Sequence, residues 1–174
     1  MRDFLLVDGY NILFADDYMS ELAIENLHSA RDYLINILEN YAGYKNLNII
    51  LVFDAHKVYN GIEKTINTGN ITIVYTKEAE TADAYIERTV SELPKLKDTK
   101  ISVATSDNIE QLIIMSKGAE RISARSLLSA LRKANQEIRQ KIKYKKPIKN
   151  NEVIENLDKE TAELLEKMRL NKDL

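Results

Sequence analysis

Short, continuously apolar runs recur along the chain, and they predict buried β-strands at residues 3–7, 48–53, 71–75, 100–104 and 119–122. Segments with a helical period separate these runs, and they predict helices at residues 20–42, 80–92, 108–116 and 123–144. Strands that are apolar throughout and alternate with helices are typical of a parallel sheet covered on both faces. The pattern therefore predicts an α/β fold.

Local signals set the expected boundaries of these elements. Ser20 is the expected N-cap of the helix at 20–42, and Gly43 follows its last turn, where a helix-ending glycine belongs. Turn residues at Gly61 and at Gly69-Asn70 mark the stretch 57–70, for which no regular element is predicted. After Pro147, an apolar stripe predicts a last amphipathic helix at residues 151–169.

The length and composition limit the classes of protein to consider. A chain of 174 residues suits one domain with a short appendage. We expect the domain at residues 1–147, including a basic helix at about 123–146, and the appendage at residues 148–174. The absence of cysteine excludes a disulfide scaffold, a cysteine zinc site and a thiol nucleophile. The N-terminal apolar run is too short for a signal peptide and no segment suits a membrane span, so we expect a cytoplasmic protein.

Charge is distributed unevenly along the chain. Residues 121–149 carry ten Lys or Arg residues and one acid, Glu137, whereas residues 1–120 carry 11 basic and 19 acidic residues. An acidic body with one dense basic segment suits contact with a polyanion. A solvated charged helix is the other interpretation of the same segment.

Three acidic residues stand where predicted strands end. Asp8 follows the first strand, Asp54 follows the second, and Asp107 lies just beyond the fourth. Ligands of open parallel α/β sheets bind outside the carboxyl ends of the strands, so these acids are expected at one edge. Each one alone is also explained as a turn or helix-cap residue, and Asp107 is a plausible cap for the helix at 108–116.

The predicted helix after the third strand adds a further group of acids. Glu80, Asp83 and Glu87 share one helix face because their spacing is i, i+3, i+7. We expect Asp83, one turn into this helix, to point at the same site as Asp8 and Asp107. A solvated acidic face near a helix N-terminus, favoured by the helix dipole, is the alternative.

Clustered carboxylates repel one another unless a cation neutralises them, and hard oxygen ligands suit Mg²⁺ or Mn²⁺. Such ions promote hydrolysis of phosphodiesters. Neither a P-loop motif nor a dinucleotide-binding glycine motif occurs. A phosphatase or receiver-like domain is a weaker interpretation, because the segment after Asp8 lacks the second acid that haloacid-type phosphatases require.

Four sequence blocks, in this order, resemble the NYN domain of the YacP-like family, within the PIN-like nuclease superfamily: Val7-Asp8-Gly9-Tyr10-Asn11, Val52-Phe53-Asp54-Ala55, Glu80-Thr81-Ala82-Asp83 and Thr105-Ser106-Asp107. The resemblance extends from residue 4 to about residue 145. It implies a three-layer α/β/α sandwich with a mostly parallel central sheet, and a metal-dependent endoribonuclease.

The resemblance also implies roles for individual residues. Asp8, Asp83 and Asp107 resemble the acidic centre that carries catalysis and binds Mg²⁺ or Mn²⁺. The implied accessory residues are Asn11, Asp54, Glu80 and Ser106. Asn11 is alternatively a turn residue that holds the Asp8 loop, and Ser106 is alternatively a helix cap.

The family includes bacterial enzymes that cut messenger RNA in association with the ribosome, so the resemblance implies RNA, and the ribosome with it, as partners. The basic segment supplies residues expected to bind RNA phosphates: Arg121, Arg125, Arg132, Lys133, Arg139, Lys141, Lys143, Lys145 and Lys146. The alternative function is a non-catalytic RNA- or ribosome-binding module with a degenerate acidic site.

Overall fold

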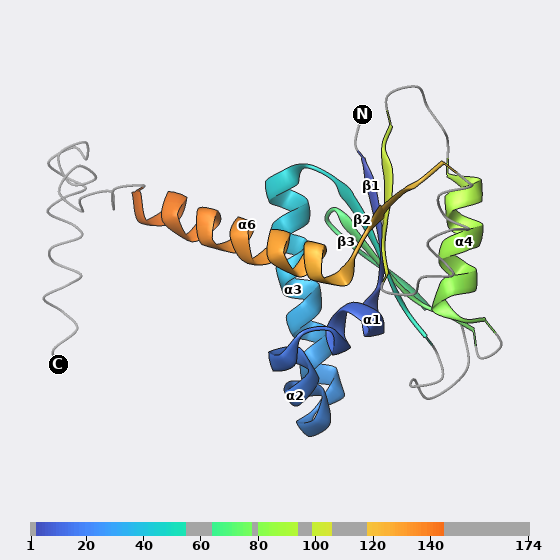
Figure 1. Ribbon diagram of the computed structural model, residues 1–174, viewed down its shortest axis with the longest axis horizontal. Helices are drawn as coiled ribbons and strands as arrows, with labels where there is room; N and C mark the ends of the chain where they lie inside the picture. The colour runs from blue at the N-terminus through green and yellow to red at the C-terminus, as the bar shows by residue number, and fades with distance from the viewer. Residues whose placement is uncertain (1–2, 55–63, 78–79, 94–98, 106–117, 145–174) are drawn as a thin grey trace, which may run out of the picture. The chain divides into compact units, whose positions relative to one another are not determined.

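The computed structural model describes residues 3–54, 64–77, 80–93, 99–105 and 118–144 (Figure 1). By contact density the chain divides into two compact units, residues 1–138 and 139–174. The strands are β1 (Phe4–Asp8), β2 (Asn48–Phe53), β3 (Lys64–Thr68), β4 (Ile71–Tyr75), β5 (Ile101–Ala104) and β6 (Glu120–Ile122). The helices are α1 (Gly9–Phe14), α2 (Asp17–Glu25), α3 (Leu27–Lys45), α4 (Ala82–Glu92) and α6 (Ala124–Tyr144).

The described strands form one six-stranded sheet in the order β3-β4-β2-β1-β5-β6. All neighbours are parallel except β3 and β4, which form an antiparallel pair. Strands β2, β3 and β4 lie on one side of β1, and the later strands β5 and β6 lie on its other side. The sheet therefore reverses its direction of growth beside β1, and its carboxyl edge there is the usual ligand-binding position in such folds.

Alternate residues of the central strands face opposite layers. Leu5 and Val7 of β1 join a core formed with α1, α2, α3 and α6, whereas Leu6 joins a second core with α4 (Figure 1). The two-residue period of a strand explains this division. The predicted α/β fold, with a mostly parallel sheet between two helical layers, is therefore confirmed.

Helix α6 packs on the sheet through one apolar stripe. Its buried residues recur at the helical spacing of three or four: Ala124, Leu127, Leu128, Leu131 and Ala134. The Ser123 hydroxyl accepts a hydrogen bond from the backbone N–H of Ser126 at 3.1 Å and so caps the first turn. The helix predicted from residue 123 to residue 144 and the short strand before it are confirmed.

The single helix predicted at 20–42 is wrong. Two helices, α2 and α3, occupy this region, and Ser20 lies inside α2. Asn26 separates them because its side chain accepts hydrogen bonds from the N–H groups of His28 and Ser29 and caps α3. Gly43 does not end α3, which continues to Lys45 and closes at Asn46 in the left-handed conformation.

Two further differences concern short elements. Strand β3 forms within the stretch for which no element was predicted, and it pairs with β4 through a turn at Gly69 and Asn70. Helix α4 begins at Ala82 rather than residue 80, because the Thr81 hydroxyl caps it. The helices predicted at 108–116 and 151–169 lie outside the described residues. No helix in the described part of the chain is long and apolar enough to cross a membrane.

Candidate active site

Asp8 stands at the centre of the carboxyl edge of the sheet. It is the last residue of β1 and the N-cap of α1, and its side chain accepts a hydrogen bond from the backbone N–H of Asn11 at 3.1 Å. The residue is only 9% exposed. The junction of strand and helix therefore holds this carboxylate in one position while largely removing it from water.

Burial raises the pKa of the Asp8 carboxyl to about 6. The negative charges of Asp83 and Asp54 contribute to this rise in pKa, and backbone hydrogen bonds from Asn11 and Tyr10 oppose it. Three of the predicted acids are therefore close enough to interact electrostatically. A cation placed among them would relieve both the desolvation and the repulsion.

Asp83 and Asp54 reach this site from different elements. Asp83 lies in the first turn of α4, whose N-cap Thr81 accepts a hydrogen bond from the N–H of Ala84 at 3.2 Å. Asp54 directly follows β2, and both acids are half-buried. Burial of Ala82 and Ile86 holds α4 against the sheet and so sets the position of Asp83.

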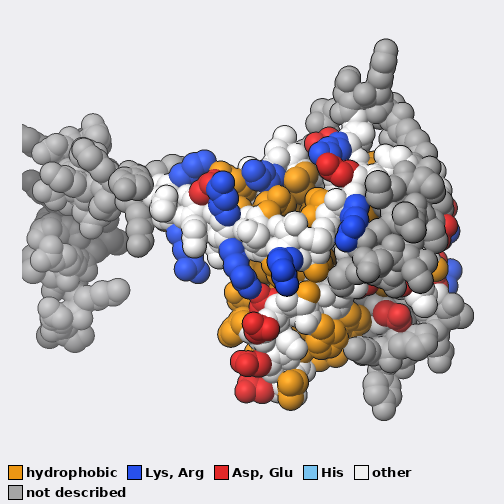
Figure 2. Space-filling model, in the orientation of Figure 1, with side chains coloured by type: hydrophobic (Ala, Val, Ile, Leu, Met, Phe, Trp, Pro, Cys, Tyr) orange, Lys and Arg blue, Asp and Glu red, His pale blue; other side chains and the backbone are white. Residues whose placement is uncertain are grey.

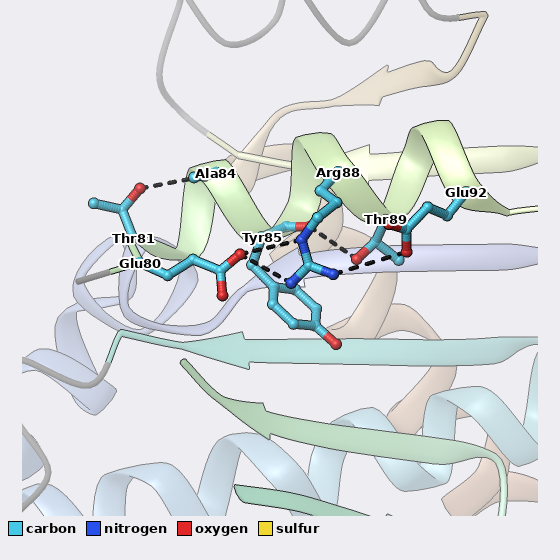
Figure 3. A network of polar contacts seen from close by, with 7 residues as sticks. All are labelled: Glu80, Thr81, Ala84, Tyr85, Arg88, Thr89 and Glu92. Atoms are coloured by element: carbon cyan, nitrogen blue, oxygen red, sulfur yellow. Dashed lines mark hydrogen bonds and ion pairs between the residues drawn. The ribbon is translucent and has the colours of Figure 1, made fainter. Parts of the chain in front are cut away.

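Glu80 has a different environment from the other acids. Its carboxylate accepts hydrogen bonds from the Arg88 guanidinium at 2.9 and 3.2 Å, outside the N-terminus of α4 (Figure 3). Arg88 also lies 4.8 Å from the centre of the Tyr85 ring and 3.8 Å from Glu92. The described contacts of Glu80 therefore connect the segment before α4 to Arg88 on the surface of α4. The expectation that Glu80 shares a helix face with Asp83 is wrong, because the helix begins after it.

Asn11 lies in α1, and the contact that it makes with Asp8 is through its backbone. This contact agrees with the interpretation of Asn11 as a residue that holds the Asp8 loop. Asp107 and Ser106, the remaining predicted residues of the centre, lie outside the described residues. Within the described part of the chain, no group of three acidic or histidine side chains is arranged to hold a metal ion.

A cluster of aromatic rings around Arg31 was not predicted from the sequence. The Arg31 guanidinium donates a hydrogen bond to the Tyr10 hydroxyl and lies 5.3 Å from the centre of that ring and 5.8 Å from that of Phe53. Phe53 in turn stacks on Tyr75 at 5.5 Å. These rings stand beside the ends of β1, β2 and β4, so the cluster places a positive charge near the acidic residues. The available sequence signal was an aromatic residue close to each strand-ending acid: Tyr10 two residues after Asp8, and Phe53 directly before Asp54.

Basic side chains gather along α6 (Figure 2). Arg121, Arg125 and Arg132 line a groove of about 860 Å³, which we call the basic groove; Ser123, Ser129 and Ala15 also line it. The Arg132 guanidinium pairs with the Asp16 carboxylate at 2.5 Å, yet its side chain is 69% exposed. Three of the basic residues predicted from the sequence therefore share one concave surface.

The other predicted basic residues are placed as follows. Lys133 is exposed on α6, and Arg139 and Lys141 are exposed on the part of α6 that belongs to the second compact unit. Lys145 and Lys146 lie outside the described residues, and for Lys143 only the backbone is described.

The basic groove and the acidic residues lie at the same edge of the sheet. Ile122 of β6 pairs with Ala104 of β5, and Ala104 pairs with Val7 next to Asp8. Neighbouring strands are about 4.8 Å apart, so the groove begins about 10 Å from the end of β1. A buried carboxylate with two half-buried acids nearby therefore shares the carboxyl edge of the sheet with the basic groove.

Comparison with known proteins defines the family. A family model described as the YacP-like NYN domain matches residues 5–170, and the chain belongs to this family of PIN-like nucleases. It is 40% identical over 141 residues to the uncharacterized protein YacP of Bacillus subtilis strain 168, covering 81% of this chain and 82% of that protein. The predicted family is confirmed.

Two crystal structures of Rae1 (YacP) from Bacillus subtilis are similar to this fold. One is 38% identical, with a TM-score of 0.74, and covers 96% of this chain and 94% of that chain. The other, of a single-substitution mutant, is 36% identical, with a TM-score of 0.70, and covers 95% of this chain and 99% of that chain. The similarity therefore extends over nearly the whole length of both chains.

Proposed function

We propose that this protein is an endoribonuclease that depends on Mg²⁺ or Mn²⁺ and cleaves phosphodiester bonds of messenger RNA in association with the ribosome. The observation that carries the proposal is the environment of Asp8. A carboxylate that is 9% exposed and faces two further acids is costly to ionise, and a divalent cation offsets that cost. Membership of a nuclease family and the basic groove support the same conclusion.

Oxygen ligands from carboxylates fit a hard divalent cation. In the proposal, Asp8 and Asp83 hold the cation together with Asp107, and Asp54 supports the site from the next strand. When bound, Mg²⁺ or Mn²⁺ supplies positive charge that activates water and stabilises the charge on the scissile phosphate.

The chain's own residues bind and orient the substrate. The Asn11 backbone N–H fixes the Asp8 carboxylate, and Glu80, through Arg88, supports the start of α4 and hence Asp83. Arg121, Arg125 and Arg132 bind phosphates of the RNA at the same sheet edge. The proposal also assigns binding of RNA phosphates to Lys133, Arg139, Lys141, Lys143, Lys145 and Lys146, and it assigns the positioning of Asp107 to Ser106.

Cleavage of RNA by the purified protein tests the catalytic part of the proposal. We expect Asp8→Asn, Asp83→Asn and Asp107→Asn each to abolish cleavage, and EDTA to abolish cleavage by the wild type. Asp32→Asn is a matched control, because Asp32 is an exposed acid on α3. Full cleavage by Asp8→Asn in the presence of Mg²⁺ would contradict the proposal.

Asp8→Asn and a charge-reversed groove together separate this proposal from a non-catalytic binding module, which the exposed basic groove also suits. For a binding module, Asp8→Asn would act like the wild type in cells and charge reversal at Arg121 and Arg125 would abolish function. Sedimentation with ribosomes, measured for the wild type and the charge-reversed variant, tests the ribosome part separately.

A further inference from the structure

A second hollow adjoins the basic groove. It has a volume of about 310 Å³ and lies among α2, α3 and α6, and we call it the tyrosine pocket; its main lining residues are Tyr18, Tyr33, Met19, Ile37, Leu131 and Asn135. Three residues, Asp17, Leu128 and Arg132, line both hollows. A molecule bound along the basic groove can therefore reach directly into the tyrosine pocket.

The pocket combines an apolar floor with exposed aromatic rings. Met19, Leu128 and Leu131 are buried, whereas Tyr18 is 57% exposed and Tyr33 39% exposed. The two rings meet edge to face, with centroids 5.2 Å apart. Large aromatic side chains exposed at the entrance of a concave site are typical of a binding surface, because their exposure to water is otherwise unfavourable.

We propose that the tyrosine pocket binds one unstacked nucleobase of the RNA strand whose phosphates lie in the basic groove. This inference rests on the proposed function, since it takes RNA as the ligand of the groove. Single-stranded RNA is recognised mainly by bases that stack on aromatic side chains, next to basic residues that bind the backbone. The two hollows provide these two features side by side.

Arg132 connects the two parts of the site. Asp16 caps α2 by accepting a hydrogen bond from the N–H of Met19 at 3.1 Å, and its second oxygen pairs with Arg132. This pairing holds the guanidinium at the boundary of the groove and the pocket. A guanidinium has five N–H donors, so Arg132 can bind a phosphate without giving up Asp16.

The volume and the polar rim suit a base. The pocket is at the small end of the range for ligand sites, which matches one planar ring system rather than a large ligand. The Asn135 amide and the Asp17 carboxylate line the pocket and offer hydrogen bonds to the edge of a base. A base inside a duplex must lose its pairing and stacking to enter, so the site favours single strands.

The experiment measures the affinity of short single-stranded RNA for full-length protein in an Asp8→Asn background, where the RNA remains intact. We expect Tyr18→Ala and Tyr33→Ala to weaken binding about 5- to 150-fold, the range for loss of stacking on one base. Tyr18→Phe keeps the ring and is expected to bind within about 2-fold of its parent. Ile24→Ala, an exposed apolar residue of α2 that does not line the pocket, is the matched control.

RNA with a single abasic position, moved along the strand, tests the same contact without changing the protein. We expect one abasic position to weaken binding to the parent protein and to leave Tyr18→Ala unaffected. Equal affinities for intact and abasic RNA at every position would overturn the inference. The inference would also be overturned if Tyr18→Ala bound RNA normally and lost only its binding to ribosomes, because that result would indicate that the pocket contacts a protein.

Wild-type cleavage, measured in parallel, distinguishes failure of this inference from failure of the proposed function. A wild type that cleaves RNA while Tyr18→Ala keeps its affinity leaves the nuclease proposal intact and rejects the base-binding pocket. Absence of both RNA binding and cleavage by the wild type overturns the two proposals together.

Discussion

The ring of Phe53 lies against the backbone of Gly9. A Cβ atom added at Gly9 would overlap Cε1 of this ring and lie 2.6 Å from its Cδ1. Phe53 is fully buried between Tyr10 and Tyr75, with ring centroids 5.2 and 5.5 Å away, so it has little room to move. The close approach places the end of β2, and therefore Asp54, beside the residue that follows Asp8.

We therefore expect Gly9→Ala to lower the free energy of unfolding by about 1–3 kcal/mol, the usual cost of adding a methyl group to a filled core. Urea denaturation measures this change. Gly43→Ala is the matched control, because no atom lies within 4 Å of a Cβ at Gly43 in α3. It is expected to stabilise by about 0.5–1 kcal/mol, since alanine is the better helix former. Equal effects of the two substitutions would contradict the packing argument.

The raised pKa of Asp8 predicts how stability depends on pH in protein freed of metal. The folded protein binds this proton more tightly than the unfolded chain, because the pKa of Asp8 rises from 3.8 to about 6. The contribution of the neutral carboxyl to stability is complete below about pH 4 and is lost as pH rises to about 6. The size of this loss is of the order of 3 kcal/mol, at 1.36 kcal/mol for each pKa unit.

Asp8→Asn removes this titration and keeps the helix cap, because asparagine is also a good N-cap residue. In EDTA, we expect the difference in stability between wild type and variant to change between pH 4 and pH 7, in favour of the variant at pH 7. Urea unfolding of both proteins across this range measures the difference. Parallel stability profiles would show that Asp8 ionises as it does in water.

Addition of Mg²⁺ or Mn²⁺ is expected to offset part of this loss of stability in the wild type. A cation that binds only the folded protein stabilises it by RT ln(1 + [L]/Kd), which is about 1.4 kcal/mol at ten times the dissociation constant. The rise in Tm at pH 8 is expected for the wild type and for Asp32→Asn but not for Asp8→Asn. A rise of the same size in Asp8→Asn would place the cation elsewhere. This measurement is independent of RNA cleavage.

Much of the fold was predictable because the central strands bury both faces. The run at residues 49–53 has no polar interruption, and an acid follows both this run and the first one, which placed Asp8 and Asp54 at one edge. Strand β3 was missed because it is an edge strand: only Ile66 is half-buried, and the other four residues are exposed. An edge strand with polar faces lacks the hydrophobic pattern that identifies a central strand.

Other features depend on contacts that sequence patterns do not carry. The helical period of the leucines continues across Asn26, so the break between α2 and α3 is visible only in the capping hydrogen bonds of its side chain. The pairing of Asp16 with Arg132 joins residues 116 positions apart. The packing of Arg31 on Tyr10 likewise depends on how α3 crosses the sheet. A single sequence contains no local signal for such long-range pairs.

The ion pair between Glu80 and Arg88 predicts that Glu80 acts as a positioning residue. We expect Glu80→Gln and Arg88→Ala each to lower stability by up to about 1 kcal/mol, because both side chains are partly exposed. Under the proposed function, both are expected to reduce cleavage to a similar extent, and the double variant no further. Glu92→Gln, which removes the weaker partner of Arg88, is the control.

The dependence of cleavage on Mg²⁺ concentration, compared between these variants and the wild type, identifies any direct role of Glu80. A positioning residue leaves the Mg²⁺ concentration for half-maximal cleavage unchanged. A shift of that concentration in Glu80→Gln, without a shift in Arg88→Ala, would instead show that Glu80 contacts the cation or its water.

The basic groove predicts a specific change in the salt dependence of RNA binding. Each phosphate contact that is lost reduces the slope of log K against log salt by about 0.7 for single strands. Arg125→Gln is therefore expected to weaken binding most at low salt and to do so equally for RNAs of different sequence. Lys100→Gln is the matched control, because Lys100 precedes β5 at the opposite, amino edge of the sheet and pairs with Glu120. A slope unchanged in Arg125→Gln, or changed equally in Lys100→Gln, would show that RNA does not lie in the groove.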